Sequence, residues 1–131
     1  MKKQPGIIMN PTAEYEEIPL RAEIFNRRSL SARLCNDTTA CTILLSHFLE
    51  MLPELIGAVT GAFASGNIPA VERSAHRLRG AAANVGAEAL AAMAQRIEEN
   101  APDNRLDETM IQRLDVEAKL FGSEVMKSGL V

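Results

Sequence analysis

Aromatic side chains are scarce in this chain of 131 residues, which has no tryptophan, one tyrosine and four phenylalanines. Alanine and leucine are abundant instead, and this composition favours helices. No segment shows the apolar–polar alternation that is typical of a strand, and no segment is repeated. The composition therefore argues against a β architecture and predicts an all-α domain.

Cysteine, net charge and long apolar runs are also limited. Cys35 and Cys41 have neither a metal-type nor a paired spacing, so we expect two buried or half-buried thiols in a reducing compartment. The net charge of −3 argues against general nucleic-acid binding. No apolar run approaches the roughly 20 residues of a membrane span, and the run at 6–9 is too short for a signal peptide. We expect a cytoplasmic protein that binds neither nucleic acid nor membrane.

Capping residues and apolar periods predict five helices, at about 27–34, 38–64, 68–85, 87–99 and 106–126. The first three helices are each preceded by a predicted N-cap, which is Asn26, Asp37 or Asn67. Gly86 follows the third helix, at a position where a left-handed backbone conformation commonly ends a helix. Four long helices with short loops predict an antiparallel up-down-up-down four-helix bundle, with the short first helix as a lid.

The bundle domain is predicted to span residues 23–128. Residues 1–22 contain three prolines and a glycine without an apolar period, so we expect a flexible N-terminal tail or linker there. The long helices use their apolar stripes inside one bundle, which predicts a monomer. The predicted inward side chains of the second and last helices are Leu44, Phe48, Met51, Leu52, Leu55, Val59 and Phe63, and Leu106, Met110, Leu114, Phe121 and Val125. His47 is interpreted as a residue at the boundary of the first of these stripes.

The predicted helix at 68–85 carries a histidine opposite its apolar stripe, which consists of Val71, Ala75, Leu78, Ala82 and Val85. At 100° per residue, His76 projects roughly 140° from the middle of that stripe and points at solvent. Gly80 and Ala83 continue the same bare strip, although a glycine inside a helix costs about 1 kcal/mol relative to alanine. The strip suits contact with another macromolecule; the alternative is an ordinary surface histidine beside a glycine that allows close helix packing.

Charged and polar residues are predicted to surround this histidine. Arg73 and Arg79, at i−3 and i+3, flank it with fixed positive charge, which favours an anion such as a phosphoryl group nearby. Folding the chain back near residue 86 places Gln95 opposite His76, with Glu98 one turn further. Either side chain could accept a hydrogen bond from Nδ1–H and leave Nε2 as a nucleophile. Alternatively, both belong only to the solvated face of their helix.

The segment AHRLRGAAANVG at 75–86, with Leu90 beyond it, resembles the signature of the histidine phosphotransfer (HPt) domain family. That signature is His, any residue, Leu, Lys or Arg, Gly, small residues, then Gly and Leu. The similarity extends from about residue 24 to about residue 121. It implies a four-helix bundle whose exposed histidine relays a phosphoryl group between receiver-domain aspartates. Arg79 stands where the family more often has lysine, so the charge is kept and a planar fork replaces a compact ammonium.

The resemblance implies roles for the residues of this strip. His76 would carry the phosphoryl group, Arg79 and less directly Arg73 would screen its charge, and Gly80 and Ala83 would let the loops of a receiver approach. As partners it implies the receiver domains of hybrid histidine kinases and of response regulators. The receiver would supply Mg²⁺, and the chain is expected to have no cofactor or metal of its own.

Other residues and other functions remain open at this point. The resemblance favours Glu98 over Gln95 for orienting Nδ1, and Arg77 is a further candidate for partner contact. No glycine-rich phosphate loop is present, so we expect a phosphocarrier without kinase activity. One alternative is the phosphoacceptor part of a sensor histidine kinase. In that family an acidic residue directly follows the histidine, whereas here Arg77 does. Another is a helical adaptor that docks receiver domains without carrying phosphate.

Overall fold

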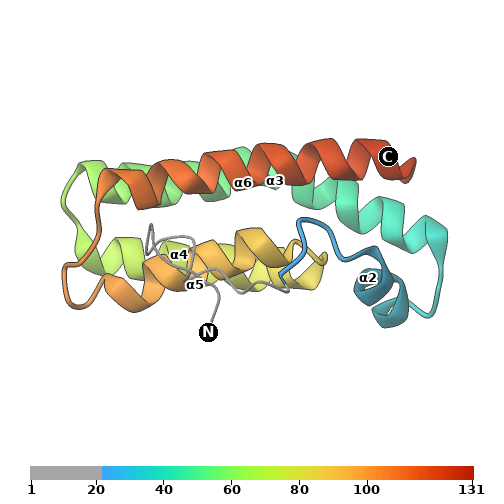
Figure 1. Ribbon diagram of the computed structural model, residues 1–131, viewed down its shortest axis with the longest axis horizontal. Helices are drawn as coiled ribbons and strands as arrows, with labels where there is room; N and C mark the ends of the chain where they lie inside the picture. Colours follow the sequence, from blue (N-terminus) through green and yellow to red (C-terminus); the bar gives the residue numbers. More distant parts are fainter. Residues whose placement is uncertain (1–21) are drawn as a thin grey trace, which may run out of the picture.

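The computed structural model describes residues 22–131, and this part of the chain consists of helices joined by turns, without strands. The helices are α2 (Arg27–Arg33), α3 (Thr38–Ala64), α4 (Ile68–Asn84), α5 (Glu88–Asn100) and α6 (Glu108–Ser128). Figure 1 shows α3 and α6 along one side of the bundle and α4 and α5 along the other. Each long helix packs against two others, in the ring order α3, α4, α5, α6. The predicted up-down-up-down bundle is confirmed, whereas residues 1–21 of the predicted tail lie outside the described residues.

Side-chain caps define where four of the helices begin. The carboxylate or amide oxygens of the N-cap residues each accept a hydrogen bond from the backbone N–H three residues on, at 2.9–3.2 Å; these residues are Asn26, Asp37, Asn67 and Asp107. The first three were predicted. The fourth corrects the last helix, which begins at Glu108 and not near Leu106, because Asp107 is extended and caps the first turn. This helix ends at Ser128, where Gly129 adopts a left-handed φ of 78°.

The core confirms the predicted stripe of α4 and corrects that of α3. All five stripe residues of α4 are at most 1% exposed. In α3, however, Cys41, Leu45 and Ile56 are buried, whereas Leu44 and the predicted Met51 and Phe63 are only half-buried. Because α3 packs against both α4 and α6, its buried face is wider than one stripe and is centred one residue further along. In α6, Leu106 precedes the helix and is half-buried, and Ile111 is buried in addition to the predicted residues.

Residues 23–26, here called the strap, precede α2 and are fixed to the turn between α4 and α5. The backbone N–H of Asn26 donates to the Gly86 carbonyl at 2.7 Å, and its side-chain amide donates to Glu88 Oε2 at 2.8 Å. Gly86 has a φ of 79°, and a Cβ built there would lie 2.5 Å from the Asn26 carbonyl oxygen. Phe25 of the strap packs edge to face on the buried Phe121 ring, with centroids 5.5 Å apart. These contacts hold α2 beside the α4–α5 hairpin.

Three minor expectations also need correction. Cys41 is buried, but Cys35 is exposed. His47 is exposed on α3 and does not border the core. Within residues 22–131, α3 is long and apolar enough to pass for a membrane span by length and composition alone. Seven of its side chains are nevertheless buried in the bundle core.

Candidate functional site

The packing of α4 determines which way its histidine faces. Because Ala75 and Leu78 are buried in the core, the residue between them on the outer surface, His76, has a side chain that is 65% exposed. Gly80 and Ala83 lie further along the same side and are also exposed. A Cβ built on Gly80 would meet nothing within 4 Å. The surface at Gly80, beside the histidine, is therefore open among the described residues.

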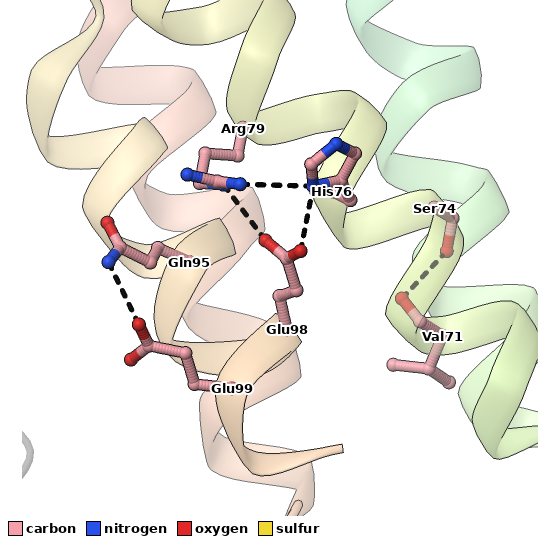
Figure 2. Close-up of polar contacts among 7 residues, drawn as sticks. All are labelled: Val71, Ser74, His76, Arg79, Gln95, Glu98 and Glu99. Atoms are coloured by element: carbon pink, nitrogen blue, oxygen red, sulfur yellow. Dashed lines mark hydrogen bonds and ion pairs between the residues drawn. The ribbon is translucent and has the colours of Figure 1, made fainter. Parts of the chain in front are cut away.

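The His76 ring is held from one side by α5. Its Nδ1 lies 2.7 Å from Oε2 of Glu98, and Figure 2 shows the other ring nitrogen facing away from that carboxylate. An ionised carboxylate only accepts hydrogen bonds, so this contact requires the proton on Nδ1. In the neutral ring, Nε2 then keeps its lone pair and faces outward. The contact thus leaves the unprotonated nitrogen of that tautomer at the surface.

Arg79 completes a group of three charged or polar side chains. Its Nε lies 2.9 Å from Oε1 of Glu98 as an ion pair, and its Nη2 lies 3.0 Å from Nδ1 of His76 (Figure 2). Because Nδ1 already carries a proton for Glu98, Arg79 acts on the ring by charge and not as a hydrogen-bond donor. Glu98 is the shared partner, and its side chain is only 20% exposed. The carboxylate therefore fixes both the imidazole and the guanidinium.

The other predicted site residues lie apart from this group. Gln95 does not contact the ring; its amide donates to Oε2 of Glu99 at 2.9 Å. The side chains of Arg73 and Arg77 are exposed on α4, with no ion pair to any described residue. Of the two residues predicted opposite His76, the structure brings Glu98 to it and leaves Gln95 on the solvated face of α5.

A basic residue of α2 lies beside the same strip and was not predicted from the sequence. Arg33 donates from Nη1 to the carbonyl oxygen of Ala83 at 2.8 Å. Arg33 and Ala83 also line a depression of about 430 Å³ between α2, α4 and α5. The two residues are separated by 50 positions, so no local pattern could reveal the contact.

The described part of the chain, residues 22–131, contains no group of three or more His, Cys, Asp or Glu side chains that could hold a metal ion.

Comparison with known proteins agrees with this geometry. The Hpt domain family profile matches residues 43–121, which is more than half of the chain and includes His76, Arg79 and Glu98. The fold is similar to the crystal structure of histidine-containing phosphotransfer protein B from Pseudomonas aeruginosa, with a TM-score of 0.70 and 24% identity over 81% of this chain and 97% of that chain. No curated protein sequence matches the chain. The chain belongs to the Hpt domain family and functions in histidine phosphotransfer within a phosphorelay.

Proposed function

We propose that His76 is the phosphate-carrying residue, which accepts a phosphoryl group from the aspartate of one receiver domain and passes it to another. The observation that supports this proposal is the 2.7 Å contact between Nδ1 and Glu98, on an exposed ring beside a bare strip. It leaves Nε2 as a nucleophile at a surface that a second domain can reach.

The transfer step follows from this protonation state. The Nε2 lone pair attacks the phosphorus of the receiver's aspartyl phosphate in line, a P–N bond forms, and the P–O bond to the aspartate breaks. The aspartate leaves as a carboxylate. The ring keeps the Nδ1 proton and becomes a phosphoimidazolium, so positive charge develops beside Glu98. The carboxylate stabilises that charge through the hydrogen bond, and the reverse reaction follows the same path.

Arg79 and the partner supply the remaining charge. We propose that the Arg79 guanidinium partly screens the charge of the phosphoryl oxygens. Its Nε forms an ion pair with Oε1 of Glu98 at 2.9 Å. Arg73 and Arg77 add positive charge at the rim. Mg²⁺ is proposed to arrive with the receiver, because phosphoryl transfer depends on neutralising the charge that develops on the phosphoryl oxygens.

In this proposal the chain is a cytoplasmic, monomeric phosphocarrier and not a kinase. Its partners are the receiver domains of hybrid histidine kinases and response regulators. Gly80 and Ala83 allow these domains to bring the aspartyl phosphate to the ring.

One labelling experiment tests the proposal. The purified chain is incubated with ³²P-labelled receiver domain, and in parallel with labelled ATP alone. We expect acid-labile label from the receiver only, and none in His76→Gln. Label taken from ATP would instead indicate a kinase component, and receiver binding without label would indicate an adaptor. Retained label in His76→Gln would refute the assignment of the phosphate to this residue.

A further inference from the structure

The depression between α2, α4 and α5 has the composition of a subsite for a partner side chain. It is lined by the exposed Ala83 of α4 and, on α5, by the half-buried Ala91 and Ala92 and the exposed Gln95. Arg33 of α2 and Arg79 of α4 also line it, and Arg79 contacts His76. The depression is thus continuous with the strip that carries His76.

The charge of Arg33 is not neutralised within the described part of the molecule. Its hydrogen bond goes to a neutral carbonyl, that of Ala83, and uses one of the five N–H donors of a guanidinium. Glu88 lines the same depression, and its two carboxylate oxygens accept from the neutral Glu23 N–H and Asn26 side-chain amide, so its negative charge remains. No ion pair joins it to Arg33, and the unused donors of Arg33 stay available to a second carboxylate.

The position of Arg33 places it inside the area that a docked domain covers. Ala83 follows His76 by seven residues, which is about 10 Å along the helix and nearly the same angular position. A transient interface that buries about 600 Å² on each partner corresponds to a disc of about 14 Å radius. A domain centred on His76 therefore reaches Arg33.

We propose that this depression is a docking subsite for the receiver domain and that Arg33 selects receivers with an acidic side chain at the matching position. The inference rests on the proposed function of His76 and adds a specificity-determining residue on another helix. Arg33 lies too far from the ring to act on the phosphoryl group, so its effect is on association. A charge at the rim of an interface acts mainly on the association rate and its salt dependence.

The experiment first identifies a receiver without relying on Arg33. Phosphoramidate, a small phosphoryl donor, labels His76 in the full chain. Purified receiver domains of the source organism are then ranked by how fast they remove the label. The fastest is used to measure Kd and transfer rate between about 50 and 300 mM salt for the wild type, Arg33→Gln, Arg33→Lys and Arg28→Gln.

The variants separate charge from structure. Arg33→Gln keeps a polar side chain and loses the charge, whereas Arg33→Lys keeps the charge. Arg28 is exposed on α2 at about 140° from Arg33 around the helix, so Arg28→Gln is a matched control for net charge. We expect Arg33→Gln to raise Kd about tenfold at low salt and to reduce its salt dependence, as for the loss of a charged hydrogen bond. The Lys variant and the Arg28 control should stay within about threefold of the wild type.

The outcomes distinguish this inference from the proposed function. Unchanged phosphoramidate labelling with weaker, less salt-dependent receiver binding in Arg33→Gln alone supports the inference. Restored binding of Arg33→Glu to a receiver with one acidic residue changed to Lys would confirm the pairing. Equal binding of Arg33→Gln and wild type overturns the inference and leaves the proposed function intact. The inference is also overturned if Arg33→Gln weakens binding equally at all salt concentrations, or if Arg28→Gln weakens binding as much as Arg33→Gln does. If no receiver removes the label, both proposals fail.

Discussion

Substitutions at Gly80 should raise the stability of the domain, and a long side chain there should also slow phosphoryl transfer. It lies inside α4, it is exposed, and an added Cβ would meet nothing within 4 Å. Alanine is about 1 kcal/mol more favourable than glycine inside a helix. Gly80→Ala should therefore raise the free energy of unfolding by about 1 kcal/mol. For a domain of this size the midpoint of thermal denaturation should rise by about 4–6 °C, measured by circular dichroism.

A longer side chain at the same position should block transfer without harming the fold. Gly80→Gln also gains helix propensity, but its side chain covers the strip between His76 and Ala83 that a receiver must contact. We expect kcat/KM for transfer from the phosphorylated receiver to fall at least tenfold, which is about 1.4 kcal/mol or more. Labelling by phosphoramidate should change little, because this small donor needs no extended contact surface.

A glycine on the opposite side of the bundle provides the control. Gly57 of α3 is also exposed, an added Cβ there would likewise meet nothing within 4 Å, and it lines the groove between α3 and α6. Gly57→Gln should give a similar gain in stability and leave transfer unchanged. The reasoning is refuted if Gly80→Gln transfers as fast as the wild type, or if Gly80→Ala lowers the denaturation midpoint.

Two further predictions concern the orienting carboxylate and the α4–α5 turn. Glu98→Gln should slow transfer about tenfold or more in stopped-flow assays, because the amide cannot stabilise the phosphoimidazolium by charge. The control Glu108→Gln, in the groove between α3 and α6, should have no effect; equal rates in the two variants would argue against an orienting role for Glu98. Gly86→Ala should lower the free energy of unfolding by more than about 2 kcal/mol in urea titrations, because alanine is strained at its positive φ and its Cβ meets the Asn26 carbonyl. Gly66 has a similar φ of 74°, but an added Cβ there would meet nothing within 4 Å. Gly66→Ala should therefore lower the free energy of unfolding by only about 1–2 kcal/mol. An equal decrease in both variants would contradict the steric explanation.

Local features of the sequence were enough to predict much of the fold. The predicted N-caps Asn26, Asp37 and Asn67 are confirmed because a cap depends on a side chain and a backbone N–H three residues away. The outward direction of His76 is confirmed because the helical period fixes it once the apolar stripe of α4 is known. The motif around it was likewise sufficient to indicate the family.

Contacts between helices could not be predicted in the same way. Gln95 and Glu98 are three residues apart and about 60° apart around α5, so a modest rotation of that helix decides which one meets the ring. The buried face of α3 shifted from Leu44 to Leu45 because two neighbouring helices determine it. The approach of Arg33 to Ala83 across 50 residues depends on how the strap fixes α2 to the α4–α5 turn. The sequence by itself determined the helices, their caps and the exposed histidine, because these depend on near neighbours in the chain. The family resemblance favoured Glu98 over Gln95, but only the tertiary structure showed that Glu98 contacts the ring and that Arg33 borders the strip beside it, since both contacts depend on how the packed helices are rotated against one another.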